Sequence, residues 1–273
     1  MITLALIDLS GTIHIGDQLI EGAVDACQRL ERHSVNVKFI TNTTKISSVT
    51  LIEQLKSFGF VNPQILTSTG AARELLIRKN QRAFALVEPE LREHDLYENN
   101  ITTLDPDEAN CVLVGLAPSQ FCYSQLNQAF RVLMRCKQST SVSSISPLIA
   151  IHKGKYLRDI DGELSLGPGG FVSCLEEATG LTAQIVGKPH VAFFTMAMGD
   201  TPPDQVVMIG DDVEQDINGA SAAGISMTML VQTGKYNTGD ENRATINTHL
   251  VPSIVEAVNA IISHNEALTN QQL

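Results

Sequence analysis

Positive charge is scarce in this sequence of 273 residues, which has 19 lysines and arginines against 30 aspartates and glutamates and a formal net charge of −11. A surface with this excess of acid repels polynucleotides and anionic membranes, so neither nucleic acid nor a membrane is expected as a partner. A phosphorylated ligand would need a local reversal of this field, which a metal ion or a well-placed lysine could supply.

Closely spaced cysteines and long apolar runs are also missing. The five cysteines are scattered, odd in number and never spaced as C-x-x-C, so we expect neither a disulfide framework nor a zinc site. The apolar run of residues 2–7 follows no basic region, and no later segment reaches the ~18 apolar residues of a membrane helix. We therefore expect a cytoplasmic protein, because free cysteines fit a reducing compartment.

Apolar and helical patterns alternate at both ends of the chain. Continuous apolar runs, which are typical of buried parallel strands, are followed by amphipathic segments, and this is the rhythm of a doubly wound α/β sheet. The expected strands are residues 1–7, 35–40, 183–186, 206–209 and 226–231. The expected helices are residues 21–32, 47–58, 191–198, 216–223 and 252–264.

The middle of the chain has strands and helices of its own. Strands are expected at residues 83–87, 111–114 and 148–151, helices at 71–78, 123–135 and 171–179, and an exposed loop over the Ser/Thr-rich run 138–146. We interpret this stretch as a second α/β domain inserted into the first. The predicted domains are residues 1–68 with 183–273, and residues 69–182.

Carboxylates follow two of the strands expected in the first domain. Asp8 ends the first strand, and Asp211 and Asp212 end a strand near the other end of the chain. The carboxyl ends of parallel strands form one edge of a sheet, where ligands bind. If the two strands are neighbours, these acids converge there with Lys188 and with Thr41. Three acids in a dry crevice need a cation, and an all-oxygen site favours Mg²⁺.

This arrangement predicts chemistry on phosphate. Asp8 would attack phosphorus and form an aspartyl-phosphate. Mg²⁺ would be held by Asp8, the backbone carbonyl of Ser10 and Asp211, and would bring the two anions together. Lys188 would place a positive charge beside both Asp8 and the phosphate.

The remaining polar residues at this edge have supporting roles. The expected ligands of the phosphoryl group, besides Lys188, are Ser10, Thr41, Asn42 and Thr43. Asp212 and Asp216 are expected to orient waters and Lys188 rather than to bind the metal.

In their order along the chain, these motifs resemble those of the haloacid dehalogenase (HAD) superfamily. Residues 8–12 (Asp-Leu-Ser-Gly-Thr) resemble its first motif, Thr41-Asn42 the second, Lys188 the third, and Gly210-Asp211-Asp212 with Asp216 the fourth. The resemblance implies a Rossmann-like core with an inserted C2-type cap, Mg²⁺ and phosphatase activity. It also implies a homodimer formed through the cap.

Ser10 departs from the family pattern. Most HAD phosphatases carry at this position an aspartate that protonates the leaving oxygen, and losing such an acid typically costs about 10²–10⁴-fold on a poor leaving group. Activated substrates suffer less, so we expect pyrophosphate, phosphoramidates of histidine or lysine, or aryl and acyl phosphates. His14 could replace the acid, although a loop histidine without a role is the better expectation.

Two alternatives stay open. Ser10 also fits a catalytically weak phosphate- or protein-binding module that kept the fold. Cleavage of C–halogen or C–P bonds is known in the superfamily, but phosphonate cleavage needs a Schiff-base lysine on the cap, and Lys153 and Lys155 lie too far along the insertion for a good match. Together with His152 and Tyr156, these lysines could instead form a loop that contacts the substrate, or simply a solvated basic turn.

Overall fold

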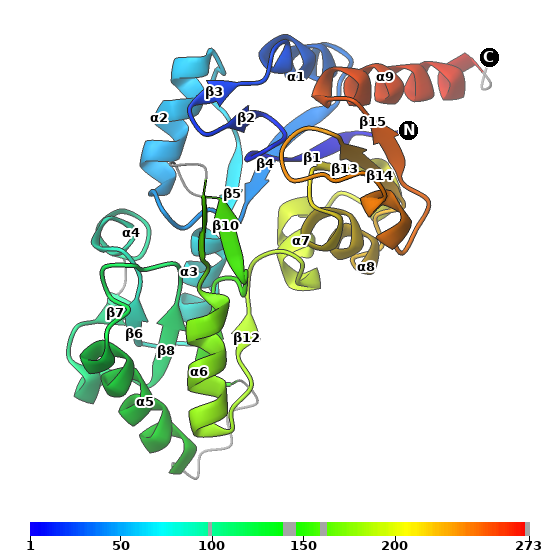
Figure 1. Ribbon diagram of the computed structural model, residues 1–273. Coiled ribbons are helices and arrows are strands. Elements are labelled where there is room, and N and C mark those ends of the chain that lie inside the picture. Colours follow the sequence, from blue (N-terminus) through cyan, green and yellow to red (C-terminus); the bar gives the residue numbers. More distant parts are fainter. Residues whose placement is uncertain (98–99, 139–145, 159–162, 271–273) are drawn as a thin grey trace. The chain divides into compact units, whose positions relative to one another are not determined.

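A computed structural model of the chain describes residues 1–97, 100–138, 146–158 and 163–270 (Figure 1). The chain forms two compact units, which we call the core unit and the inserted unit. The core unit comprises Met1–Thr41, Ile52–Leu66 and Lys188–Leu273, and the inserted unit comprises Asn42–Leu51 and Thr67–Gly187. Compared with the limits expected from the sequence, residues 42–51, 67–68 and 183–187 therefore belong to the inserted unit.

The core unit is built on a six-stranded sheet in the order β15-β14-β13-β1-β4-β5. Each of the pairs from β15 to β4 is parallel. From β1 the chain continues to β4 and β5 on one side and later builds β13, β14 and β15 on the other, so the order reverses between β1 and β13. The strands are β1 (Leu4–Asp8), β4 (Asn36–Thr41), β5 (Ile65–Thr67), β13 (Val206–Gly210), β14 (Met227–Val231) and β15 (His249–Val251).

Helices cover both faces of this sheet. Figure 1 shows α1 (Ala23–Arg32) and α9 (Ile254–Asn270) side by side on one face, with α7 (Val191–Met198) and α8 (Gly219–Ala222) on the other. In α1 the buried residues recur at helical spacing, which explains why this segment packs as an amphipathic helix; they are Ala23, Ala26, Cys27 and Leu30. The other elements are α2 (Ser48–Phe58), η3 (Pro203–Gln205), η5 (Asp240–Arg243) and the hairpin β2 (His14–Ile15)–β3 (Gln18–Leu19).

The helix expected at residues 216–223 begins earlier and has two parts. A π-helical turn, η4 (Val213–Asn218), precedes α8. The carboxylate of Asp212 accepts hydrogen bonds from the backbone amides of Glu214 and Gln215, both at 3.0 Å. Because this N-cap satisfies the first amides of the turn, the helical segment starts directly after Asp212.

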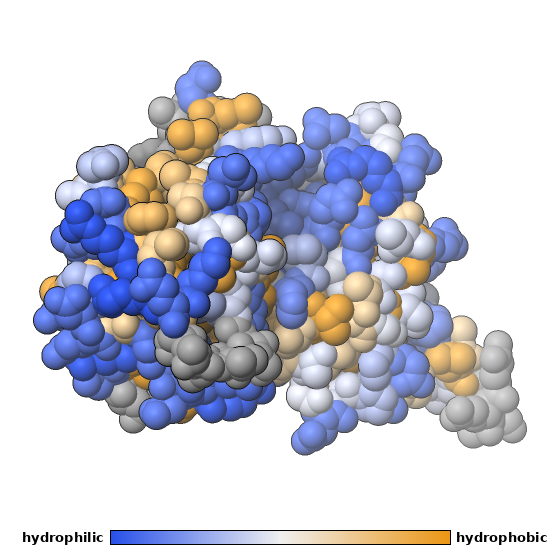
Figure 2. Space-filling model, turned by 90° about the horizontal axis from the view of Figure 1, so that it is seen from below, coloured by the Kyte–Doolittle hydropathy of each residue, from blue (hydrophilic) through white to orange (hydrophobic). Residues whose placement is uncertain are grey.

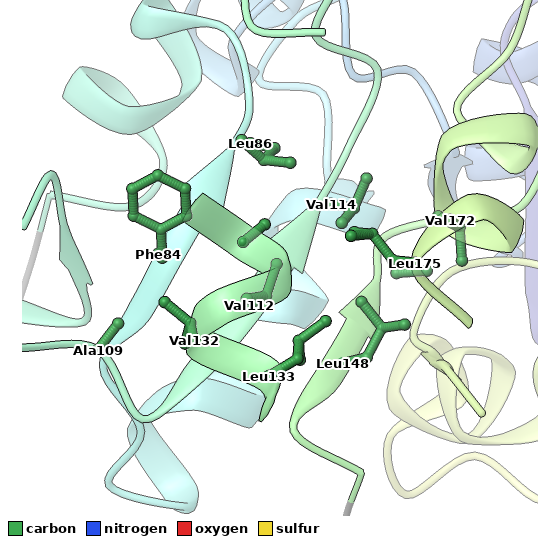
Figure 3. Close-up of a cluster of buried hydrophobic side chains, with 12 residues drawn as sticks. Phe84, Leu86, Ala109, Val112, Val114, Val132, Leu133, Leu148, Val172 and Leu175 are labelled. Atoms are coloured by element: carbon green, nitrogen blue, oxygen red, sulfur yellow. The ribbon is translucent and has the colours of Figure 1, made fainter. Parts of the chain in front are cut away.

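The inserted unit has a parallel five-stranded sheet in the order β12-β9-β8-β6-β7. Figure 3 shows apolar side chains of this sheet packed against those of α5 and α6. The strands are β6 (Ala83–Leu86), β7 (Thr102–Thr103), β8 (Cys111–Val114), β9 (Leu148–Ala150) and β12 (Gln184–Ile185). The helices are α3 (Ser68–Arg78), α4 (Pro89–His94), η2 (Pro106–Glu108), α5 (Tyr123–Gln138) and α6 (Gly169–Thr179). A separate antiparallel ribbon joins β10 (Tyr156–Arg158) to β11 (Leu164–Leu166).

The strand expected at residues 183–186 does not belong to the core sheet. β12 pairs with β9, with Gln184 opposite Ile149, and the amide of Val186 donates to the carbonyl of Ala150 at 3.0 Å. This corrects the expectation from sequence, because a short apolar run predicts a strand but not the sheet that it joins. The Ser/Thr-rich run 138–146 lies, apart from its two end residues, outside the described residues.

Hydrophilic residues predominate on the face of the molecule shown in Figure 2, with apolar residues in smaller groups between them. Among the residues that the structure describes, there is no helix whose length and apolar character would let it cross a membrane.

Candidate active site

Two acidic side chains meet where the order of the core sheet reverses. Asp8 is the last residue of β1, and Asp211 directly follows β13, its parallel neighbour. Both are buried, with exposed fractions of 6% and 3%. Asp216, from η4, is the third acid: Asp8, Asp211 and Asp216 each offer a carboxylate oxygen within 4.8 Å of the others. Three buried acids therefore lie close together at the switch point of the sheet, where ligands bind in folds of this kind.

One lysine is buried among these acids. Nζ of Lys188 lies 2.5 Å from Oδ1 of Asp8 and 2.7 Å from Oδ1 of Asp216. It also donates to the carbonyl of Ile40, near the end of β4, at 3.4 Å. Burial alone would lower the pKa of Lys188, but the charges of Asp216 and Asp8 outweigh it and raise this pKa. The ammonium therefore stays charged and holds the ends of β1, β4 and η4 together.

A second lysine lies on the more exposed side of the site. The backbone amide of Lys235, in the loop after β14, donates to Oδ2 of Asp211 at 2.7 Å. Its Nζ lies 3.3 Å from Oδ2 of Asp212. Burial would raise the pKa of Asp212, but the charge of Lys235 and the amide of Gln215 lower it. Asp212 is therefore an ionised N-cap paired with Lys235.

The charges of this cluster do not balance. With every group ionised, the cluster has a surplus of two negative charges. It consists of four carboxylates and two ammonium groups, from Asp8, Asp211, Asp212, Asp216, Lys188 and Lys235. Burial and the neighbouring Asp8 and Asp216 raise the pKa of Asp211 well above its ordinary value. Burial, with Asp8 and Asp212, raises the pKa of Asp216 to about 7 although Lys188 opposes the shift. One divalent cation would balance the surplus charge and offset the repulsion between the carboxylates.

The residues fit such a cation. Carboxylate oxygens are hard ligands, which suit a hard divalent metal. Lys188 contacts one oxygen each of Asp8 and Asp216, whereas Asp211 is held by a backbone amide. Both oxygens of Asp216 have partners, because its Oδ2 also accepts from the backbone amide of Asp212 at 3.2 Å. Asp8 and Asp211 are therefore the better candidates for metal ligands.

Two glycines make room for the carboxylate of Asp211. A Cβ at Gly11, where φ is +93°, would lie 2.0 Å from Oδ2 of Asp211, and one at Gly234, where φ is +68°, would lie 2.1 Å from the same oxygen. The hydroxyl of Thr233 donates to the carbonyl of Gly11. The loops after β1 and β14 thus enclose Asp211 from two sides.

The other residues expected at the site lie in different settings. Thr41 is buried at the end of β4, and Ser10 is exposed two residues beyond the end of β1. Asn42 and Thr43 are half-buried and belong to the inserted unit. There the side-chain oxygen of Asn42 packs against Gly187, where an added Cβ would lie 2.3 Å from it.

Several other residues singled out in the sequence have local partners. Nδ1 of His14 lies 2.7 Å from the carbonyl of Gly16, and its ring packs near Phe58 with 5.9 Å between the ring centroids. Within the inserted unit, Lys153 forms an ion pair with Glu176. Each of the two residues therefore has partners within its own unit.

Three residues at the site were not assigned a role from the sequence: Thr233, Gly234 and Lys235. The sequence held one indication of their place, because they follow a buried strand of the same sheet as Asp8. Without the strand order, a Thr-Gly-Lys sequence after a strand looks like an ordinary turn.

Comparison with known proteins shows the family of the chain. A model described as haloacid dehalogenase-like hydrolase matches residues 5–99, and one described as HAD-hydrolase-like matches residues 185–257. The chain belongs to the haloacid dehalogenase-like hydrolase family and is an enzyme of that hydrolase class. Haloacid dehalogenase-like hydrolase domain-containing protein 2 from Mus musculus is 42% identical over 264 residues, 95% of either chain. The Homo sapiens phospholysine phosphohistidine inorganic pyrophosphate phosphatase is 32% identical over 268 residues, 95% of this chain and 94% of the relative.

Solved structures share the fold. The p-nitrophenyl phosphatase from Archaeoglobus fulgidus superposes with a TM-score of 0.83 at 24% identity, covering 94% of this chain and 98% of that one. A 4-nitrophenylphosphatase from Thermotoga maritima gives 0.81 at 22% identity, covering 94% and 97%. The fold class expected from the sequence is thereby confirmed: a Rossmann-like doubly wound core with an inserted α/β cap of the C2 type.

Proposed function

We propose that this enzyme is a Mg²⁺-dependent phosphohydrolase that works through an aspartyl-phosphate on Asp8. The observation that carries the proposal is the placement of Asp8, whose buried carboxylate contacts the ammonium of Lys188 and lies within 4.8 Å of an oxygen of the metal-ligand candidate Asp211. A carboxylate paired with an ammonium group in this way is held in place for attack on phosphorus.

The proposed reaction has two steps, both carried by Asp8. Its carboxylate forms a bond to phosphorus while the bond from phosphorus to the leaving oxygen or nitrogen breaks. Water then attacks phosphorus, releases phosphate and regenerates the Asp8 carboxylate. Bound Mg²⁺, with Asp8, the backbone carbonyl of Ser10 and Asp211 as its proposed ligands, supplies the charge that polarises a phosphoryl oxygen.

The other residues of the site bind and orient. Lys188 would contact the phosphoryl group as well as Asp8, and Asp216 would keep its ammonium in place. Asp212 would hold the cation of Lys235 at the edge of the site. The proposed donors to the remaining phosphoryl oxygens are Ser10, Thr41, Asn42 and Thr43.

Activated phosphates are the proposed substrates. Ser10 supplies no carboxylic proton for a poor alkoxide leaving group, whereas pyrophosphate, phosphoramidates, and aryl and acyl phosphates need little help in leaving. Similar proteins support this class by name: one relative is called a phospholysine, phosphohistidine and pyrophosphate phosphatase, and two structural neighbours are called nitrophenyl phosphatases.

The test compares Asp8→Asn with wild-type protein on pyrophosphate and on an aryl phosphate, with and without Mg²⁺. Asp17→Asn, a change at an exposed aspartate in the β2–β3 turn, is the matched control. Asp8→Asn should lose essentially all turnover, whereas Asp17→Asn should keep it. Equal rates for Asp8→Asn and wild type would refute the mechanism.

The second candidate function is a catalytically weak module that binds phosphate or a protein. The serine at position 10 favours it, because it removes the usual acid without disturbing Asp8. Such a module would form a beryllium fluoride adduct on Asp8 and yet show no turnover across a broad panel of phosphate compounds. Turnover of any activated phosphate that depends on Asp8 would exclude it.

Assembly and location complete the proposal. The inserted unit would act as a cap that contacts the phosphorylated small molecule or phospho-amino acid, and two chains would pair through this cap. Light scattering of the purified protein would test the dimer. The five free cysteines fit the reducing conditions of the cytoplasm.

A further inference from the structure

The segment Thr233–Gly234–Lys235, which we call the β14 clasp, contacts Asp211 and the loop that contains Ser10, which carry two of the three proposed metal ligands. Its Lys235 amide donates to Oδ2 of Asp211 at 2.7 Å. Its Thr233 hydroxyl donates to the carbonyl of Gly11, the residue after Ser10. One short loop therefore bonds to the acid after β13 and to the loop after β1.

Close packing makes this contact specific. The Cα of Gly11 lies so near Gly234 that an added Cβ at position 234 would come within 2.5 Å of it, besides 2.1 Å from Oδ2 of Asp211. Since Gly234 also has a φ of +68°, any side chain there would be strained and would displace either Asp211 or the Gly11 peptide. The loops after β1, β13 and β14 are therefore in close contact at this point.

We propose that the β14 clasp positions the metal site: it sets the orientation of the Asp211 carboxylate and its distance from the Ser10–Gly11 peptide. The proposal rests on the proposed function, since it concerns the same metal. The hydrogen bond from the Lys235 amide to Oδ2 and the close glycine backbone restrict the movement of the Asp211 carboxylate. Groups that orient metal ligands in this way typically contribute about 10- to 100-fold to metal affinity.

Gly234→Ala tests the packing, and Gly239→Ala is its matched control. Both glycines lie in the loop after β14 with positive φ, +68° and +98°, so both variants carry a similar backbone cost. A Cβ at Gly239 would meet only Nδ2 of Asn242, at 3.8 Å. Calorimetric titration of the metal-free proteins with Mg²⁺ should show about 10- to 100-fold weaker binding for Gly234→Ala and an unchanged affinity for Gly239→Ala. Equal affinities of the two variants would overturn the proposal.

A milder change tests the hydrogen bond without adding bulk. Thr233→Val removes the donor to the Gly11 carbonyl, and Thr233→Ser retains it. Thr228→Val, on β14 itself, removes a buried threonine hydroxyl that donates to Thr248 at 2.9 Å, away from the site. Thr233→Val should weaken Mg²⁺ binding severalfold, and Thr233→Ser should restore it. If Thr228→Val weakens binding as much as Thr233→Val does, the hydrogen bond has no specific role and the proposal fails.

Asp211→Asn separates this proposal from the proposed function. If wild-type protein binds Mg²⁺ and Asp211→Asn does not, the metal site stands whatever the clasp variants do, and those variants then decide the clasp alone. If wild type and Asp211→Asn bind Mg²⁺ equally, the metal site is misplaced and both proposals fall.

Discussion

The ammonium of Lys188 lies 2.5 Å from the carboxylate of Asp8, although 180 residues separate them in the sequence. Both groups are buried, and the same ammonium also donates to the carboxylate of Asp216 at 2.7 Å. Removing one partner of a buried ion pair destabilises a protein more than replacing the whole pair by apolar residues, because the remaining charge keeps its desolvation penalty. Lys188 is therefore predicted to matter for folding as well as for chemistry.

Lys188→Met should reduce the free energy of unfolding by about 3–5 kcal/mol, since it leaves two buried carboxylates without their cation. Urea unfolding measures this loss, with Lys56→Met on the exposed face of α2 as a control that should change it by less than about 0.5 kcal/mol. Adding Asp216→Asn to Lys188→Met should restore part of the loss, because one unpaired charge is removed. Additive losses in the double variant would contradict this coupling.

Gly210→Ala tests how tightly Asp216 is enclosed. A Cβ at Gly210 would lie 2.3 Å from Oδ2 of Asp216, so the carboxylate or β13 must move. We expect a loss of about 1–3 kcal/mol in the free energy of unfolding, as for other overpacked sites. Gly170→Ala, where an added Cβ meets nothing within 4 Å, should leave the urea midpoint unchanged or raise it slightly. Similar midpoints for the two variants would show that Asp216 has room to shift.

The position of Asp8 and Asp211 could be predicted from sequence because two local signals coincide there. An apolar run predicts a buried parallel strand, and an acid directly after it must lie at the carboxyl edge of the sheet. No such rule covers the β14 clasp. Its contacts come from a backbone amide, a glycine without a side chain and one hydroxyl, and residue types alone do not reveal which amide a carboxylate will find.

The short strands, or the sheets that they join, could also not be predicted from the sequence. β12 was expected in the core sheet, yet its two residues pair with β9 of the inserted unit. The hairpin β2–β3 and the edge strand β5 were not expected at all, because runs of two or three residues show no periodicity. For such segments the choice of partner is made by tertiary packing.

Stabilisation by Mg²⁺ should grow with pH. The pKa values of Asp211 and Asp216 are raised, that of Asp216 to about 7, so the metal-free folded protein keeps protons that the unfolded chain releases above its ordinary aspartate pKa of ~3.9. The folded state binds more protons over this window, and its stability without metal therefore falls as the pH rises from about 4 to about 7. Mg²⁺ replaces these protons and offsets the loss.

Thermal unfolding with Mg²⁺ and with a chelator measures this effect. The difference in Tm should be small near about pH 5 and larger near about pH 8, where fewer protons compete with the metal for Asp211. Asp211→Asn should show little difference at either pH. A Mg²⁺-dependent shift of equal size at both pH values would mean that Asp211 does not hold the metal.

Ser10→Asp should widen the range of leaving groups. An aspartate at this position brings a carboxylic proton, which a serine cannot supply near neutral pH, so hydrolysis of an alkyl phosphate monoester should rise by about 10²-fold or more. Pyrophosphate and aryl phosphates leave without such help, and their rates should change much less. Steady-state kcat/KM on the two kinds of substrate gives the comparison. Ser10→Asn, which has nearly the same shape but no acidic proton, separates proton donation from a change in packing. If Ser10→Asn matches Ser10→Asp, or if Ser10→Asp speeds both kinds of substrate equally, the missing acid is not what restricts this enzyme to activated phosphates.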